Sequence, residues 1–371
     1  MRIEITSMVL VATLWVGGAG HAARSAPGSE LGQEVRPSDE GKDIEALVDV
    51  QQRMMKTLPA LHGLRGQHFK HHGCVVATFS VDAGLTDELR YGLFRNPATY
   101  QAVVRFSNGG SIDDTKPDVH GMAVKLVGLK GERANADEHE TQDFVLIDSR
   151  VFFMRNVKSN LEFAKALEEI KAQPPNFDRM KIFNKGHKEE GVLAADAVSR
   201  VISNPLRAQY WSTTPYKLGS GAVKYSARPR DLETPPPAAP GTTADYLRDA
   251  MVERLSSGKE PVVFDFYVIR QTDPASQPIE DPTVEWRTEP VKVATITIKP
   301  QGFSSAEQLE FCENLSYNPW HALSDHRPLG GINRARDPVY RMSTELRHAT
   351  RKVARKEPTA DDLSQFSRTA P

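Results

Sequence analysis

Two kinds of hydrophobic spacing alternate along the 371 residues of this chain. Apolar residues recur every three or four positions in some segments, as in amphipathic helices, and at every second position in others, as in half-buried strands. The helical spacing predicts helices over Asp43–Leu58, Asn160–Lys171, Asp178–Lys188, Leu193–Val201, Tyr246–Ser256 and Ser304–Asn314. Strands are predicted over Cys74–Val81, Pro261–Arg270 and Val291–Ile298, with two more strands joined by a Gly-Ser-Gly turn within Ala208–Tyr225. The mixture predicts an α+β protein.

The two ends of the chain differ from the rest in composition. Residues 1–26 combine Arg2, the apolar run Met8–Val16 and a small-residue stretch that ends at Ala23, which predicts a cleaved export signal. The apolar run is shorter than the about 20 residues that span a bilayer, so no membrane span is expected after cleavage. Residues 27–42 are predicted to be a flexible leader and residues 357–371 a polar, frayed tail. Residues 43–356 would form one domain of a periplasmic or secreted protein.

Overall charge and cysteine content exclude several classes of protein. The formal net charge is -1, so no basic field supports a nucleic-acid partner. Only Cys74 and Cys312 are present, which excludes a disulfide-rich fold and a cysteine-rich metal site. We expect two separate buried thiols, although an oxidising compartment would also permit them to pair.

The segment Asn333–Arg347, NRARDPVYRMSTELR, can place a tyrosine and an arginine on one helix face. Asp337 and Pro338 are typical of an N-cap and a first helical residue, which predicts that Tyr340 lies in the first turn. Arg347 follows seven positions later, about two turns and roughly 10 Å along the same face. A solvated or lightly packed helix face would show the same pattern.

The charges around Tyr340 favour an ionised side chain. Arg336 lies four residues before it and Arg341 directly after it, and a helix N-terminus would add a positive potential. A phenolate is an anionic oxygen ligand suited to ferric iron. The sequence therefore makes Tyr340 a candidate metal ligand.

A histidine-rich segment precedes the first predicted strand. Leu64–Val81 contains Arg65, His68 and the neighbouring pair His71 and His72. A neutral imidazole can accept a proton at one nitrogen and release it again, which suits acid–base catalysis. All three histidines remain candidates for that role, and the cluster could instead bind a divalent metal.

Further polar residues interrupt the predicted strands. The segment Ala102–Gly110, AVVRFSNGG, places Arg105 and Ser107 near the end of a strand that runs into glycines. An edge strand that ends in a turn would have the same composition. The next strand is predicted over Pro117–Lys125.

These motifs together resemble haem catalases and catalase-like haem proteins. The resemblance is carried, in chain order, by Arg65-x2-His68, by VRFS at Arg105 and Ser107, by HGMAVK from His120, by DFVLIDSRVFFMR around Asp148, and by Arg336-x3-Tyr340-x6-Arg347. It covers roughly residues 60 to 348. It implies a catalase-like closed antiparallel β-barrel of about eight strands with flanking and C-terminal helices, which binds haem b through its iron.

The resemblance also implies a role for each matching residue. Tyr340 would ligate the iron and Arg336 would contact its oxygen, as tyrosine does in catalases. His68 would be the distal acid–base residue, and Ser107 would orient its imidazole. The remaining cofactor-binding candidates are the propionate partners Arg65, Arg105 and Arg347 and the haem-facing residue Val124.

Two positions depart from the catalase pattern, and at the first of them His120 replaces an arginine. Counting back from Val151, Asp148 falls where catalases have a distal asparagine, whereas a shift of one residue would place Ile147 or Ser149 there. An asparagine side chain donates a hydrogen bond to a bound peroxide, and an ionised aspartate does not. Asp148 is therefore a third catalytic candidate, and its identity favours peroxidase over catalase action.

The resemblance predicts an exported haem peroxidase that reduces hydrogen peroxide or organic hydroperoxides through a ferryl intermediate, using an electron donor that the sequence does not identify. Two alternatives stay within haem binding: a hydroperoxide-rearranging enzyme of the allene oxide synthase type and a non-catalytic periplasmic haem-binding protein. An exported domain without haem is a further alternative. A minimal core of this size predicts a monomer or a homodimer.

Overall fold

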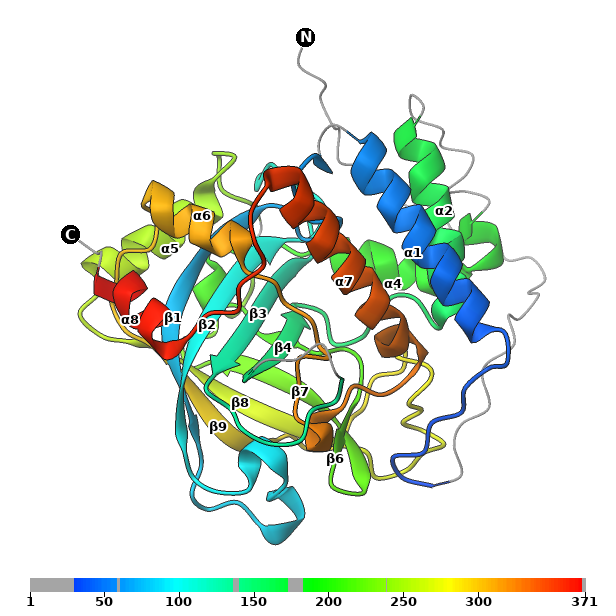
Figure 1. The fold of residues 1–371 in the computed structure, drawn as a ribbon, viewed down its shortest axis with the longest axis horizontal. Helices are drawn as coiled ribbons and strands as arrows, with labels where there is room; N and C mark the ends of the chain where they lie inside the picture. The colour runs from blue at the N-terminus through cyan, green and yellow to red at the C-terminus, as the bar shows by residue number, and fades with distance from the viewer. Residues whose placement is uncertain (1–29, 59–60, 136–139, 173–182, 238, 369–371) are drawn as a thin grey trace.

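The computed structural model describes residues 30–58, 61–135, 140–172, 183–237 and 239–368, with a closed antiparallel barrel of eight strands at its centre (Figure 1). The hydrogen-bonded order is β5-β4-β3-β2-β1-β9-β8-β7, and pairing of β5 with β7 closes the ring. The strands are β1 His71–Val81, β2 Thr99–Asn108, β3 His120–Val127, β4 Thr141–Ile147, β5 Tyr210–Trp211, β7 Gly221–Pro229, β8 Val262–Arg270 and β9 Val291–Ile298, and β6 Tyr216–Leu218 adds to the side of β7. The predicted fold class and barrel are confirmed.

Aromatic side chains fill the interior of the barrel. The rings of Phe144 and Phe266 lie 4.9 Å apart, and Phe79 packs edge-on against Phe266 at 5.2 Å. Tyr225 of β7 contacts Phe144 of β4 at a ring distance of 4.9 Å. The interior is therefore a packed core, and a large ligand has room only outside the strands.

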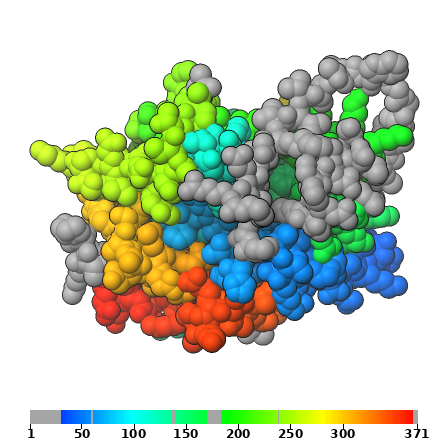
Figure 2. Space-filling view, turned by 90° about the horizontal axis from the view of Figure 1, so that it is seen from above, coloured from blue at the N-terminus to red at the C-terminus, as the bar shows by residue number. Residues whose placement is uncertain are grey.

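Helices cover the outside of the barrel. They are α1 Glu40–Thr57, α2 Val157–Ala172, α4 Lys188–Val198, α5 Tyr246–Ser257, α6 Ala306–Asn314, α7 Gly331–Arg351 and α8 Ala360–Arg368. Short 3-10 turns occur at Asp87–Leu89, Gly92–Phe94, Pro205–Arg207 and Ser324–His326. Most helices match their predicted ranges; of the predicted helix Asp178–Lys188, residues 178–182 lie outside the described residues and residues 183–186 are helical. Figure 2 shows the face on which α5 in yellow-green and α6 in orange lie next to each other.

A layer of three helices lies against one side of the barrel. Apolar residues of α1 and α2 pack together, and Ala335 of α7 joins their cluster. In Figure 1, α7 runs diagonally beside the strands β3 and β4. This arrangement leaves α7 facing the outer surface of those strands.

The start of α7 differs from the sequence prediction. The helix begins at Gly331, so Pro338 lies inside it and Tyr340 is not in the first turn. Carboxylates from distant segments replace the expected Asp337 cap: Glu280 accepts from Gly331 N at 2.8 Å, and Glu34 accepts from Gly330 N at 2.8 Å. The helix-end potential acts mainly on the first turn, so it does not reach Tyr340.

Both predicted flexible ends pack onto the domain where they are described. In the predicted leader, Glu34 pairs with Arg334 of α7, and Gly32 N donates to Gln271 at 2.8 Å. In the predicted tail, Glu357 lies 2.8 Å from the buried Lys125, and Leu363 of α8 is fully buried. The domain thus extends beyond residues 43–356 at both ends. The predicted export signal, residues 1–26, lies outside the described residues.

The two cysteines form a disulfide, so the expectation of separate thiols is wrong. Cys74 of β1 and Cys312 of α6 have sulfur atoms 2.08 Å apart, although 238 positions separate them in sequence. The bond ties α6 to the barrel. Within the described residues, no helix combines the length and apolar character needed to cross a membrane.

Candidate functional site

His68 lies in the irregular segment before β1, and three contacts fix its position. Its backbone N donates to Gly109 O at 2.9 Å, and Arg105 Nη2 donates to its carbonyl oxygen at 2.8 Å. Its Nδ1 lies 3.1 Å from Ser107 Oγ. His68 has a φ of 52°, a left-handed conformation that is uncommon outside glycine. Because Arg105 and Ser107 of β2, with Gly109 just after it, hold both the backbone and the side chain of His68, the imidazole has one defined orientation.

Gly121 of β3 makes room for this imidazole. A Cβ atom at Gly121 would lie 2.7 Å from His68 Nδ1 and 2.8 Å from Ser107 Oγ, which no side chain tolerates. Burial, followed by the positive charges of Arg105 and Arg336, lowers the pKa of His68 to about 3. The imidazole is therefore neutral at physiological pH, with one nitrogen able to accept a proton.

Tyr340 lies in the middle of α7 and pairs with Arg336 one turn earlier. Arg336 Nη2 donates to the Tyr340 oxygen at 3.0 Å, and the guanidinium also lies 5.1 Å from the centre of the ring. Asn333 accepts from Arg336 Nη1 at 3.2 Å and holds the guanidinium in place. Burial lowers the pKa of Arg336, but Tyr340 and Tyr216 raise it by more, so the cation is retained. Arg336 is thus placed to stabilise negative charge on the Tyr340 oxygen.

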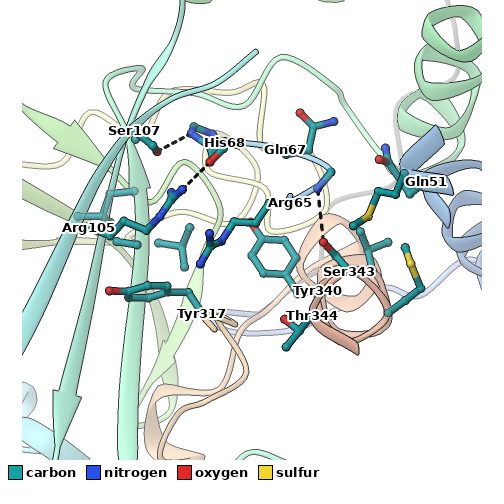
Figure 3. Close-up of a pocket in the computed structure, with 18 of the residues that line it drawn as sticks. Gln51, Arg65, Gln67, His68, Arg105, Ser107, Tyr317, Tyr340, Ser343 and Thr344 are labelled. Atoms are coloured by element: carbon teal, nitrogen blue, oxygen red, sulfur yellow. Dashed lines mark hydrogen bonds between the residues drawn. The ribbon is translucent and has the colours of Figure 1, made fainter. Parts of the chain in front are cut away.

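His68 and Tyr340 line the same cavity, which lies between the barrel and α7 (Figure 3). The cavity contains about 750 Å³ of space, counting its open side. Its walls also include Arg65, Arg105, Ser107, Gly121, Met122, Ala123, Val145, Leu146, Tyr317, Val339 and Thr344, with Gln51 and Met55 from α1. The size and apolar walls suit one flat organic cofactor or ligand.

Three arginines lie around the Glu313 carboxylate at the edge of this cavity; Arg105 and Arg347 are buried, and Arg65 is 13% exposed. Arg65 lies 2.7 Å from Glu313, and Arg347 Nη1 lies 3.9 Å from the same side chain. Arg65 and Arg347 both donate to the carbonyl oxygen of Leu315. Burial and Arg65 lower the pKa of Arg105 to about 9 and that of Arg347 to about 8. The cluster therefore has more positive than negative charge.

This excess of charge provides a test of whether the site fits haem. Within the described residues, the buried Nε atoms of Arg105 and Arg347 have no hydrogen-bond partner. Buried cations without partners are costly, and two carboxylates beside them would remove that cost. Haem b carries two propionates and a flat apolar ring. The arginine cluster, the apolar walls and the Tyr340 oxygen therefore fit haem b.

Asp148 does not join this cavity. Its two carboxylate oxygens bind His120: one accepts from the backbone N at 2.8 Å, and the other lies 2.7 Å from Nδ1. Both side chains are only 4% exposed. Burial lowers the pKa of His120, but the nearby carboxylates, Asp148 foremost and then Asp118 and Asp114, together raise it by more, so the net shift is upward. The structure thus pairs Asp148 with His120, the two residues at which the chain departs from the catalase motifs.

Asp148 and Val124 are not among the residues that line the cavity. β4 ends at Ile147, so Asp148 lies just beyond the strand, where His120 binds its carboxylate. Val124 pairs with Phe144 in register and is fully buried in the barrel core, whereas its neighbour Ala123 lines the cavity. Ala123 replaces Val124 as the residue on this wall.

The neighbouring histidines have other environments. His72 Nε2 lies 3.0 Å from Asn108 Oδ1 in a fully buried position, and His71 lies beside Glu313. Burial lowers the pKa of His71 to about 2. In the part of the chain that the structure describes, no group of three His, Cys, Asp or Glu side chains is arranged to hold a metal ion.

The sequence did not identify several residues of the site. Glu313 holds the arginines, and Gly121 makes room for the imidazole. Tyr317 and Met55 line the cavity. Only Gly121 had a signal, because it lies within the HGMAVK motif. The others come from segments whose position depends on how the chain folds.

Comparison with known proteins gives one kind of match. No family model matches the chain, and no curated protein matches its sequence. Among solved structures, a bacterial catalase aligns with a TM-score of 0.59 at 16% identity, over 93% of this chain and 71% of its own. A fungal catalase aligns with a TM-score of 0.56 at 15% identity, over 89% of this chain and 66% of its own. Catalase A from Saccharomyces cerevisiae aligns with a TM-score of 0.51 at 16% identity, over 90% of this chain and 68% of its own. This chain, which spans about two thirds of those proteins, therefore has the catalase-like fold.

Proposed function

We propose that this protein is a haem-dependent peroxidase that reduces hydrogen peroxide or organic hydroperoxides. One observation carries the proposal: a neutral imidazole, His68, and an arginine-paired phenol, Tyr340, line one cavity beside three arginines with too few counter-charges. The structural likeness to catalases agrees with it.

The residues of the cavity would hold haem b at both its centre and its edge. Tyr340 would ligate the iron, with Arg336 stabilising charge on the ligand oxygen. Arg65, Arg105 and Arg347 would pair with the propionates through charge-assisted hydrogen bonds. Bound haem supplies the redox chemistry that cleaves the O–O bond of a peroxide.

His68 would move the proton of this reaction. Its pKa of about 3 keeps it neutral, so it can accept the proton from one peroxide oxygen and return it to the departing oxygen. Ser107, at 3.1 Å from Nδ1, fixes the ring so that the other nitrogen serves as the proton-transfer atom. Gly121 keeps that orientation free of steric conflict.

Peroxidase action is favoured over dismutation of hydrogen peroxide. The carboxylate of Asp148 is turned to His120, and the cavity wall nearby is formed by the apolar Val145. Met55 and Met342 add apolar surface to the lining, which also suits the alkyl part of an organic hydroperoxide. A separate electron donor then completes the reaction.

Two substitutions test the proposal in protein loaded with haem. Tyr340→Phe should change the ferric optical spectrum or release haem, whereas Tyr267→Phe on β8 should do neither. His68→Ala should keep haem and lose peroxide reduction by about 10²- to 10⁴-fold, the range for a general acid–base residue. His62→Ala, an exposed position, is its control. An unchanged spectrum in Tyr340→Phe, or an unchanged rate in His68→Ala, would remove the assigned role.

The same measurements separate the other candidates. A hydroperoxide-rearranging enzyme would consume a fatty-acid hydroperoxide without an electron donor. A haem-binding protein without activity would release haem readily and would not react with peroxide. We also propose export to the periplasm or the outside and action as a monomer or homodimer. Cell fractionation and sedimentation test these two points.

A further inference from the structure

An open groove lies beside the arginine end of the cavity. It contains about 900 Å³ of space, counting its open side, and is formed by α5, α6, the end of α7 and the segment before β1. Figure 2 shows this face, with α5 in yellow-green, α6 in orange and the segment before β1 in blue. Arg65 lines the cavity, Glu313 lines the groove, and these side chains lie 2.7 Å apart. The Arg65–Glu313 ion pair therefore connects the linings of the two spaces.

One wall of the groove is apolar. Its lining residues of this kind are Leu64, Phe69, Ile112, Ala306 and Leu309. Ile112 is 55% exposed, an unusual degree for a large aliphatic side chain, and Phe69 is mostly buried. An aromatic ring of a ligand would remove part of this surface from water.

The charged residues of the groove are paired, with one exception. Lys70 lies 2.5 Å from Asp114, and Arg351 lies 2.6 Å from Glu310. Arg248 has no carboxylate partner among the described residues. Its Nε and Nη2 donate to the backbone oxygens of His72 at 3.1 Å and His71 at 2.7 Å.

Arg248 is thus a fixed cation with unused hydrogen-bonding capacity. The two backbone bonds orient its guanidinium, and within the described residues Nη1 makes no hydrogen bond. The imidazole of His71, which also lines the groove, is neutral because burial and nearby arginines lower its pKa to about 2. The unpaired positive charge of the groove therefore lies on Arg248, beside an apolar wall.

We propose that this groove binds a phenolic acid, a small aromatic reductant whose carboxylate pairs with Arg248 and whose ring packs on Phe69 and Leu309. The inference rests on the proposed peroxidase function and supplies its electron donor. Two phenol groups each lose one electron and one proton and become phenoxyl radicals. The peroxide ROOH takes up these two electrons and two protons and becomes ROH and water.

Binding can be tested without peroxide, on the haem-loaded protein. Calorimetric titration uses 4-hydroxybenzoate as the probe and its methyl ester as the uncharged control. Arg248→Met should weaken binding of the acid about tenfold, the value of one charge-assisted hydrogen bond, and should leave the ester nearly unaffected. Arg254→Met, on the same helix but outside the groove, should bind the acid as the wild type does.

A second variant guards against a structural effect of removing Arg248. Ala306→Phe fills the groove from an exposed helix position and breaks no side-chain hydrogen bond, and it should weaken both probes. In peroxide turnover, Arg248→Met should raise KM for the acid about tenfold with a much smaller change in kcat.

The possible outcomes separate this inference from the proposed function. Equal binding of the acid by Arg248→Met and Arg254→Met, or no binding to the wild type, would overturn the groove assignment even if another donor supports peroxide reduction. Binding that follows the expected pattern in a protein that reduces no peroxide with any donor would instead refute the peroxidase proposal and, with it, the donor role.

Discussion

Replacement of Asp148 by asparagine distinguishes the sequence-based role of this residue from its structural one. If Asp148 occupied the distal catalytic position, Asp148→Asn would raise the rate at which the protein dismutates hydrogen peroxide. In the structure, however, the carboxylate binds the backbone N of His120 at 2.8 Å and its Nδ1 at 2.7 Å, outside the cavity lining. We therefore expect the substitution to reduce stability and to leave dismutation nearly unchanged.

The size of the stability loss follows from the contacts of the pair. Asparagine keeps an oxygen for the backbone N–H of His120 but loses the charge that pairs with the imidazole. Removing one partner of a buried ion pair costs about 3–5 kcal/mol when the other charge remains. His120 can lose its proton instead, so we expect a cost of about 2 kcal/mol, near that of one charge-assisted hydrogen bond.

The pH dependence has a defined sign. The pKa of His120 is raised in the folded protein, so its stabilising contribution is fully present below the unfolded-state value, about 6.5, and is lost as pH rises through the folded-state value. The difference between wild type and Asp148→Asn in free energy of unfolding should therefore be largest near about pH 6 and smaller in alkaline solution.

Urea unfolding at several pH values, together with oxygen release from hydrogen peroxide, measures both effects. The double variant His120→Gln/Asp148→Asn removes both charges and should recover part of the lost stability. A several-fold rise in oxygen release with unchanged stability would refute the structural role and place the Asp148 carboxylate in the catalytic cavity.

Three further predictions concern the support of the site. Gly121→Ala should displace the His68 imidazole and lower the rate of peroxide reduction by about 10²-fold while haem stays bound, because small misplacements of a catalytic group cost that much. Gly84→Ala, with nothing near its added Cβ, is the control. A wild-type rate in Gly121→Ala would contradict the assignment. Glu313→Gln should lower the melting temperature of haem-free protein more than that of haem-loaded protein, because propionates would replace the lost charge; equal losses would contradict it. Cys74→Ser/Cys312→Ser should lower the free energy of unfolding by about 2–5 kcal/mol relative to the oxidised protein. A thiol reductant should lower the free energy of unfolding of the wild type only.

The sequence predicted the local motifs and their order, because the structure of each motif depends on residues that are close in sequence. Alternating apolar residues specify strands, and the helical spacing of Arg336 and Tyr340 places them one turn apart wherever the helix begins. The resemblance of those motifs to catalases gave the barrel, which the structure confirms. His68 and Ser107 lie on neighbouring segments and meet as the motifs implied.

The tertiary structure decided the features that depend on distant segments. Glu34 and Glu280 move the start of α7 to Gly331, and no local signal encodes those caps. Strand alternation places Ala123 and Val124 on opposite faces of β3 but does not say which face is inside the barrel. Closure of the barrel buries Val124 in the core and leaves Ala123 on the cavity wall. Cys74 meets Cys312, and Asp148 meets His120, only because separate segments pack together. The sequence by itself determined the reactive groups, whereas packing between remote segments determined which of them share the cavity.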